Sequence, residues 1–345
     1  MWVRIPPSPL YALIFMSRKL FYKISKLKPK YKKIFLRIFE FKIEKTKLLL
    51  PQEIKKSFSQ FEKQEIFILR NKILKQETHF NIQRGKRKEP PKENNLNNFY
   101  DPFCDPLKNT PFDNWGRLEN KFAITASNLA KSSKNHSLVI FKEHNLEKVN
   151  LKDIENVFKL ANLWLNKFND KFKIIIWNFG FRAGASIYHP HLQIFSLNEM
   201  PLKIKDLFDK FDNYKNIFNS DYLKDYFLLT KFLKLGEEYK NIKISLNLTP
   251  IKDKEIIFWG DNFDKKIKNI SYIVYSYLKS LSQEDFNLFL FINNNSFLGF
   301  LVSRGNKNKL NSDIGSLELY AFSVVGFDLI DFSRIFFTRL KELKH

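Results

Sequence analysis

The amino-acid sequence predicts an α+β fold of two similar halves, each an antiparallel sheet with packed helices, behind a basic N-terminal extension. The first observation is the order of hydrophobic patterns in residues 138–197, which reads strand, helix, strand, turn, strand. The second is the return of this order in residues 255–303, which indicates an internal duplication. We therefore divide the chain into the extension (residues 1–60), a first half (61–200) and a second half (201–345).

The elements of the first half follow from the spacing of its apolar residues. Residues 17–60 are rich in lysine and partly helical in period, so we expect the extension to lie on the surface. Glu89–Asn98 is polar, contains prolines and is typical of a linker. The predicted elements are a strand that begins in residues 62–72, a strand at Leu138–Phe141, a helix at Leu151–Phe168 capped by Asn150, and strands at Lys173–Asn178 and His191–Leu197.

The second half repeats the order with different chemistry. Its predicted elements are a strand at Glu255–Trp259, a helix at Lys266–Leu281 and strands at Phe286–Ile292 and Phe297–Ser303, with helices around Leu202–Phe211 and Asp221–Tyr239 between the halves. After His191 the next histidine is His345, at the end of the chain. We therefore expect the second half to pack against the first and to help form a pocket, without a histidine of its own at the site.

The most informative segment is Asn178–Phe195, in which a turn of small residues precedes a His-Pro-His sequence at residues 189–191. On the strand that follows, His191 and Gln193 alternate with apolar residues, so both side chains point to one face. The glycines and the serine of the turn allow backbone N–H groups to approach an anion closely. A histidine can attack a phosphorus atom held there, whereas a glutamine cannot shuttle a proton. The pair therefore favours passing a phosphorus-containing group to an acceptor over hydrolysing it.

This segment resembles the histidine-triad (HIT) superfamily, specifically its transferase branch of galactose-1-phosphate uridylyltransferases and of phosphorylases for dinucleoside polyphosphates or nucleotide sugars. The resemblance implies two fused HIT-like halves. It also implies that His191 forms a covalent nucleotidyl-histidine intermediate and that Gln193 stands where the hydrolases of the superfamily have a further histidine. Asn178, Gly184 and Ser186 would then contact the phosphates of the nucleotide.

Weaker matches extend the resemblance over most of the first half, in the order of the family. Arg84 and Arg87 resemble a basic loop that embraces the nucleotide, and guanidinium groups suit phosphate oxygens. Asn120 and Phe122 belong to a Trp-x-Arg…Asn-Lys-Phe pattern that contacts base and ribose in the family. In the second half, Arg304 resembles a phosphate ligand of the phosphorylases.

The resemblance also implies a zinc site, and here the chain departs from the family. Members often bind zinc through two cysteines, a distal histidine and the first histidine of His-Pro-His. The corresponding set is Asp101, Cys104, His144 and His189, because Cys104 is the only cysteine in the chain. In an alternative register, Leu107 replaces the second cysteine. A carboxylate is an accepted zinc ligand, and some branches of the family have no metal. Retained zinc and two buried, hydrogen-bonded histidines both stay open.

The composition restricts the partners and the compartment. A formal net charge of +23 is typical of proteins that bind nucleic acid. We do not expect nucleic acid as a partner, because abundant Lys, Phe, Asn and Ile beside only 10 Gly indicate an AT-rich genome that places lysine on solvated faces. No apolar run reaches the roughly 18 residues of a membrane span. The single cysteine excludes a disulfide framework and fits a reducing, cytoplasmic compartment.

The first residues carry a separate hypothesis about the start of the chain. Residues 3–6, Val-Arg-Ile-Pro, can be encoded by the consensus sequence of a tRNA T-arm. We therefore expect residues 1–15 to be a reading frame that runs through an adjacent tRNA gene. Met16 would then be the start of the protein.

Together these observations predict a nucleotidyltransferase that acts on a nucleotide sugar and a sugar phosphate through a nucleotidyl-histidine, similar to the UDP-hexose:hexose-1-phosphate uridylyltransferases. The hexose-binding signature of those enzymes is not recognisable, so the sugar stays open. A phosphorylase, with a nucleotide sugar or dinucleoside polyphosphate as donor and inorganic phosphate as acceptor, is the alternative within the enzyme class. Outside it are a nucleotide-binding protein without activity and a basic protein that associates with nucleic acid. Members of the family are commonly dimers, so the resemblance implies a homodimer.

Overall fold

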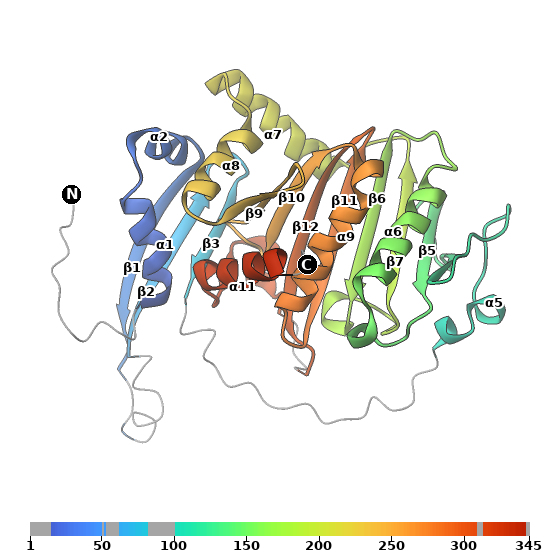
Figure 1. The fold of residues 1–345 in the computed structure, drawn as a ribbon. Coiled ribbons are helices and arrows are strands. Elements are labelled where there is room, and N and C mark those ends of the chain that lie inside the picture. Colours follow the sequence, from blue (N-terminus) through green and yellow to red (C-terminus); the bar gives the residue numbers. More distant parts are fainter. Residues whose placement is uncertain (1–14, 50–51, 53–61, 82–100, 309–312, 343–345) are drawn as a thin grey trace.

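The computed structural model describes residues 15–49, 52, 62–81, 101–308 and 313–342. The main element of this part of the chain is an antiparallel sheet of nine strands in the order β4-β5-β7-β6-β11-β12-β10-β9-β8 (Figure 1). A smaller sheet in the order β1-β2-β3-β13 lies beside it, next to the N-terminal helices.

The first half contributes four strands to the large sheet. Its elements are η3 (Pro102–Cys104), α5 (Pro106–Asn109), β4 (Ala123–Ser127), β5 (Asn135–Phe141), η4 (Leu146–Lys148), α6 (Leu151–Leu165), β6 (Phe172–Phe179), η5 (Phe181–Ala183) and β7 (His191–Leu197). α6 begins where the side chain of Asn150 accepts the backbone N–H groups of Lys152 and Asp153. Asp153 accepts the N–H of Asn150 in return. This capping box satisfies N–H groups that have no partner within the helix, and the predicted cap at Asn150 is confirmed.

The second half contributes the other five strands. Its elements are α7 (Leu202–Phe218), α8 (Tyr222–Phe232), β8 (Gly236–Tyr239), β9 (Ile242–Leu246), β10 (Ile256–Asp261), α9 (Phe263–Ser280), β11 (Glu284–Asn293), β12 (Ser296–Asn306), α10 (Ser316–Tyr320) and α11 (Leu329–Glu342). The helix predicted at Asp221–Tyr239 is wrong in its last part, because α8 stops and β8 follows. Lys234 adopts a left-handed backbone with φ 60°, which helices exclude, and the chain reverses there.

The two halves repeat one arrangement on either side of the pair formed by β6 and β11. Counted outward from this junction, the strand order is β6, β7, β5, β4 in the first half and β11, β12, β10, β9 in the second. A long helix precedes the junction strand of each half, α6 before β6 and α9 before β11. The predicted fold of two fused halves is therefore confirmed. The halves do not keep separate sheets, because β6 pairs with β11 and joins them into one.

The large sheet has one face covered by α6 and α9 (Figure 1). Alternate residues of the central strands pack beneath these helices in the main core, namely Val139, Phe141, Ile175, Trp177, Leu192, Ile194, Leu288 and Leu290. Successive side chains of a strand point to opposite faces. His191, Gln193 and Asn178 therefore lie on the face that α6 and α9 leave uncovered.

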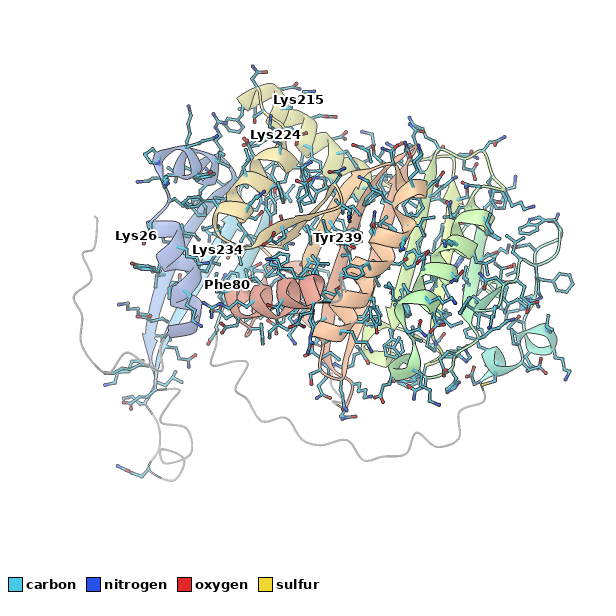
Figure 2. The ribbon with its side chains drawn as sticks, viewed as in Figure 1. Lys26, Phe80, Lys215, Lys224, Lys234 and Tyr239 are labelled. Carbon is cyan, nitrogen blue, oxygen red and sulfur yellow. The ribbon has the colours of Figure 1, made fainter. Side chains whose placement is uncertain are left out.

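The basic N-terminal extension is folded over residues 15–47. It consists of α1 (Phe15–Ser25), α2 (Pro29–Ile38) and β1 (Phe39–Lys47), and the small sheet is completed by β2 (Lys63–Asn71), β3 (Gln76–Phe80) and β13 (Ser323–Val325). One side of the two helices is buried, and Lys30, Lys32 and Lys33 on α2 are exposed. The buried residues are Leu20, Phe21, Ile24, Ile34, Phe35 and Ile38. Figure 2 shows the same arrangement further along the chain, where Lys215, Lys224 and Lys234 point outward from α7, α8 and the turn after α8. Across the described ranges, no helix has both the length and the apolar content that crossing a membrane would need.

A buried carboxyl group lies in the loop between β9 and β10. Glu255 is only 5% exposed, and its side chain accepts the backbone N–H of Ile251 at 2.7 Å. Burial raises its pKa to about 7, although the hydrogen bonds from Ile251 and Asn247 oppose the shift. The folded protein therefore keeps a proton on Glu255 at pH values at which the unfolded chain has lost it.

This raised pKa predicts a decline in stability with pH. The folded pKa lies above the unfolded value of 4.5, so the contribution is fully present below that value and is lost as pH rises to about 7. Glu255→Gln, which is neutral throughout, should be more stable than wild type at pH 8, by up to about 3 kcal/mol, and similar to it at pH 4.5. Thermal unfolding across this range, with exposed Glu238→Gln as control, measures the difference. Parallel curves for wild type and Glu255→Gln would contradict it.

Candidate active site

His191 is held in one orientation by its own backbone. Its Nδ1 lies 2.8 Å from the carbonyl oxygen of His189, so Nδ1–H donates and Nε2 keeps its lone pair. The ring meets the edge of Phe103 from η3, with centroids 5.0 Å apart. Burial lowers the pKa of His191, against the opposing effect of the hydrogen bond to His189. The neutral ring, which can act as a nucleophile, is therefore favoured.

Gln193 is oriented by a histidine of the neighbouring strand. Nε2 of His136 lies 3.2 Å from both Oε1 of Gln193 and Nδ2 of Asn128. Nδ1 of His136 accepts the backbone N–H of Ser132 at 3.1 Å, so in the neutral ring Nε2 carries the hydrogen, and of its two neighbours only the oxygen of Gln193 can accept it. His136 is buried and stacks on Phe195, and burial lowers its pKa, which favours the neutral ring. Because its oxygen is bound to His136, the amide of Gln193 turns its NH₂ group to the other side.

The turn between β6 and β7 is held by its own backbone hydrogen bonds. The backbone N–H groups of residues 183–185 bond to carbonyl groups within the turn. Gly184 has a left-handed φ of 84° with open space around it. Gly180 has no room for a side chain, because a Cβ atom would lie 2.0 Å from the carboxylate of Asp285. The N–H groups at 183–185 therefore close the turn itself, and Ser186 is an exposed polar side chain that it offers to a ligand.

Arg304, predicted as a phosphate ligand, is engaged inside the protein. Its Nε and Nη2 donate to the carboxylate of Asp313 at 2.7–3.1 Å, and its Nη1 donates to Asn287 at 2.8 Å. Only 12% of the side chain of Arg304 and 13% of that of Asp313 are exposed. Asn287 in turn donates to Asn178. The structure thus connects Arg304 to the site through Asn287 instead of presenting a free guanidinium group there.

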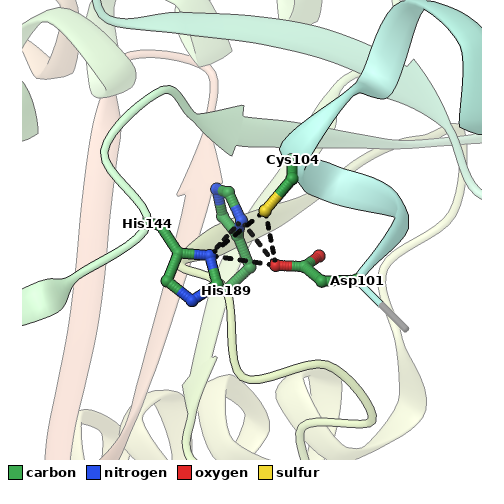
Figure 3. A group of neighbouring side chains, drawn as sticks. All are labelled: Asp101, Cys104, His144 and His189. Carbon is green, nitrogen blue, oxygen red and sulfur yellow. Dashed lines mark hydrogen bonds and ion pairs between the residues drawn. The ribbon is translucent and has the colours of Figure 1, made fainter. Parts of the chain in front are cut away.

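Four residues of the metal set predicted from the sequence lie together at the start of β7 (Figure 3). Oδ2 of Asp101 is 3.0 Å from Nδ1 of both histidines, and these two nitrogens are 3.2 Å apart. Sγ of Cys104 lies 3.3 Å from Oδ2 of Asp101 and 3.4 Å from Nδ1 of His144. Leu107, the residue of the alternative register, is exposed and outside the group.

The donor set fits a tetrahedral metal. Ligands at the usual Zn–S and Zn–N distances are about 3.3–3.6 Å apart in a tetrahedron, close to the separations seen here. Nε2 of His189 bonds to the carbonyl oxygen of Phe141 at 2.8 Å, which directs the lone pair of Nδ1 into the group. Burial and the neighbouring Asp101 raise the pKa of the Cys104 thiol. A metal ion would replace that proton, since the thiolate is the form that binds metals.

The residues predicted to contact the base lie apart from this centre. The amide nitrogen of Asn120 donates to a carbonyl group of α6 at 3.0 Å, and its oxygen accepts the N–H of Phe122 and of the next residue. α6 covers the face of the sheet opposite to His191, so the structure does not bring the Asn120 amide to the nucleophile. Phe122 is partly buried beside it. Arg84 and Arg87 lie outside the described residues.

Three residues that hold the site together were not assigned a role from the sequence. His136 has a detectable signal, because a histidine in one strand can face Gln193 in the next and the chain has few histidines. Asp285 and Asn287 lie at the start of β11, and no pattern in the sequence indicates a role for them. Their partners are more than one hundred residues away in the chain.

Comparisons with known proteins define the class of fold. No family model matches the chain, and no curated protein sequence matches it. An ADP-glucose phosphorylase from Arabidopsis thaliana with bound ADP-glucose has a similar structure, with a TM-score of 0.57 at 14% identity over 78% of this chain and 97% of that one. A uridylyltransferase gives 0.55 at 12% identity, over 80% of this chain and 98% of that one. A galt-like protein from Arabidopsis thaliana gives a TM-score of 0.52 at 15% identity, over 72% of this chain and 93% of that one.

These similarities and the strand order establish an α+β protein with two similarly built halves in one chain. The fold that the sequence resemblance implies is confirmed: the chain has the architecture shared by the uridylyltransferase and the ADP-glucose phosphorylase.

Proposed function

We propose that the protein is a nucleotidyltransferase that passes a nucleotidyl group from a nucleotide sugar to a sugar phosphate through a covalent intermediate on His191. The observation that carries this proposal is the bond from Nδ1 of His191 to the carbonyl of His189, which leaves Nε2 available for attack. The amides of Gln193 and Asn178 lie on the same face of the sheet. A uridylyltransferase and an ADP-glucose phosphorylase with bound ADP-glucose share the fold, which supports a nucleotide-sugar donor.

In the first step, Nε2 of His191 attacks the α-phosphorus of the donor. An N–P bond forms, the P–O bond to the sugar phosphate breaks, and its electron pair leaves on the sugar phosphate oxygen. The NH₂ groups of Gln193 and Asn178 face the non-bridging oxygens, with Gly184 and Ser186 at the edge of the same site. Donors that are already oriented stabilise charge that develops in the transition state most strongly.

In the second step, a phosphate oxygen of the acceptor attacks the same phosphorus. The N–P bond breaks and its electron pair returns to Nε2 of His191. A phosphate oxygen is already ionised, so this attack needs no general base. Water would need one, and Gln193 cannot remove a proton. The site therefore favours transfer to a phosphorylated acceptor over hydrolysis.

We also propose that Asp101, Cys104, His144 and His189 hold a zinc ion, which would supply a structural link between three segments of the chain. η3 brings Asp101 and Cys104, the loop after β5 brings His144, and His189 directly precedes β7. The carbonyl group that orients His191 belongs to His189. Residues that fix His189 therefore also fix the ring that carries the intermediate.

A phosphorylase is the second candidate, and the similarity to the ADP-glucose phosphorylase favours it. The first step is the same, and inorganic phosphate replaces the sugar phosphate in the second. Transfer to inorganic phosphate gives a nucleoside diphosphate, whereas transfer to a sugar phosphate gives a nucleotide sugar. The product therefore distinguishes the two reactions.

Incubation with a suitable donor should increase the protein mass by one nucleotidyl group. The donors to compare are UDP-glucose, ADP-glucose, GDP-glucose and diadenosine tetraphosphate, and intact-protein mass spectrometry detects the adduct and identifies its base. His191→Ala removes the nucleophile and should show no gain. Binding of the nucleotide without an adduct for any donor would instead indicate a nucleotide-binding protein without transferase activity.

Gln193→His should accelerate hydrolysis of the nucleotidyl-histidine intermediate. The new imidazole can accept a proton from water, and a positioned base commonly accelerates such steps by a factor of about ten or more. The decay of the nucleotidyl adduct without acceptor measures the change. Gln193→Leu, which removes the amide without adding a base, should slow adduct formation and leave the decay unchanged. Equal decay rates for Gln193→His and wild type would contradict the role given to Gln193.

The metal group should bind about one zinc ion per chain. Cys104→Ser should weaken binding more than about tenfold, since loss of even an outer partner of a metal ligand has an effect of that size. Cobalt(II) titration is the measurement, because a thiolate ligand gives a charge-transfer band that Cys104→Ser must lose. His79→Ala, a histidine outside the group, serves as control. Binding without the band would exclude Cys104 as a ligand.

A further inference from the structure

Asn287 of the second half makes three hydrogen bonds at the turn that precedes His191. Its Nδ2 donates to Oδ1 of Asn178 at 2.7 Å and to the carbonyl oxygen of Ala183 at 2.8 Å. Its Oδ1 accepts from Nη1 of Arg304 at 2.8 Å. β11 and β6 place Asn287 directly opposite Asn178 in the sheet, so both side chains share one face.

Arg304 fixes the direction of this amide. A guanidinium group has only donors, so it can bond to the oxygen of Asn287 and not to its nitrogen. Arg304 is itself held by the carboxylate of Asp313 through three contacts, and both side chains are largely buried. The NH₂ group of Asn287 must therefore point toward Asn178 and the turn.

The direction of Asn287 determines the direction of Asn178. Because Oδ1 of Asn178 accepts from Asn287, its NH₂ group points away from that bond. Asn178 is two residues from Ile176, which pairs with Gln193, so the two amides lie on the same face of adjacent strands. Gln193 is oriented in the same sense, with its oxygen bound to His136. Both amides thus offer hydrogen-bond donors beside His191.

We infer that Asn287 is a positioning residue for nucleotidyl transfer, which it promotes by holding the NH₂ group of Asn178 toward the phosphate and by securing the turn at Ala183. This inference rests on the proposed function. Asp285 supports the same turn from the same strand, since its Oδ2 accepts the backbone N–H of Arg182 at 3.0 Å. The second half therefore contributes to the chemistry of the first without contributing a nucleophile.

Asn287→Asp tests the inference with a minimal change of shape. The carboxylate still accepts from Arg304 but cannot donate to Asn178 or to Ala183. The Asn178 amide must then rotate to donate to the new carboxylate, which turns its oxygen toward the phosphate. In a single turnover with the donor that labels wild type, the rate of adduct formation should fall by about tenfold to a hundredfold, as expected when an oriented donor is lost. The final amount of adduct should stay complete, because the fold and His191 are unchanged.

The controls separate a positioning role from a structural one. Asn295→Asp removes an Asn–Asn hydrogen bond of the same kind, to Asn262, at the other end of the β11–β12 hairpin, and should leave the rate unchanged. If Asn287→Asp does not fold, as judged by thermal unfolding, Asn287→Ser is measured instead, with the same loss of rate expected. A variant with less adduct but an unchanged rate would show a structural role only and overturn the inference.

A double-mutant cycle tests whether Asn287 acts through Asn178. In the Asn178→Ala background, Asn287→Asp should slow the reaction less than it slows wild type, since one of its two acceptors is gone. If the two substitutions lower the rate of adduct formation independently, so that their factors multiply in the double variant, Asn287 does not act through Asn178. A wild-type rate for Asn287→Asp would overturn the inference and leave the proposed function intact. Absence of any adduct in wild type would overturn both, so the two failures are distinguishable.

Discussion

The pairing of β6 with β11 is the constraint on which the candidate site depends. The two strands come from different halves, more than one hundred residues apart in the chain, and run antiparallel with Asn178 opposite Asn287. Trp177 and Leu288 secure this register, because both are buried beneath the helices on the covered face. A slip of one residue would turn Asn287 toward the core and place an apolar side chain beside Asn178. The burial that joins the halves therefore also aligns the polar groups on the other face.

The same register gives the turn before His191 its shape. Asp285 fills the space next to Gly180 and accepts the N–H of Arg182, so the turn is held from the second half at its beginning. Nε of Arg182 donates to the carbonyl oxygen of Arg304, which adds a contact from β12. The turn leads directly into the carbonyl group that orients His191. This accounts for a second half that has kept its strand order, although no histidine lies where the first half has its pair.

Much of the fold could be predicted from local sequence. β7 has the predicted bounds, since polar and apolar residues alternate from His191 to Ile194, and α6 begins at the predicted cap because Asn150 and Asp153 stand at the spacing of a capping box. The metal group could be predicted because its four residues occur at spacings that the family resemblance supplies. β8 could not be predicted from local sequence. Its separation from α8 depends on the left-handed backbone of Lys234, and lysine is a residue type that is common in helices.

The hydrogen bonds of the site could not be predicted, because they depend on which long-range partners the fold brings together. Arg304 illustrates this, since an arginine just after the predicted strand Phe297–Ser303 suggests a ligand for phosphate until the structure shows Asp313 beside it. An asparagine at the start of an apolar strand gives equally little indication of a role. Only the register of β6 on β11 reveals that Asn287 faces Asn178. Local pattern thus located the proposed nucleophile, and tertiary contacts determined what surrounds it.

A phosphate site built from amides has a problem that charged sites do not have. The two ends of an amide are nearly the same size, so a glutamine or asparagine can present either a donor or an acceptor to the ligand. Here each oxygen is bound by a group whose role is fixed. The backbone N–H of Ser132 sets the tautomer of His136, which donates to Gln193. Arg304 can only donate, and its hydrogen bond to the oxygen of Asn287 sets the direction of that amide.

Each of these chains of hydrogen bonds ends in a group that cannot reverse its role: a backbone N–H in one and the carboxylate of Asp313 in the other. An amide at the end of such a chain has its NH₂ group directed toward the face opposite α6 and α9 without cost at the moment of reaction. The site can therefore present oriented donors to a phosphate from the neutral side chains of Gln193 and Asn178. In the proposed reaction, the specificity for a phosphorus centre then comes from the direction of two neutral side chains and not from the high net charge of the protein.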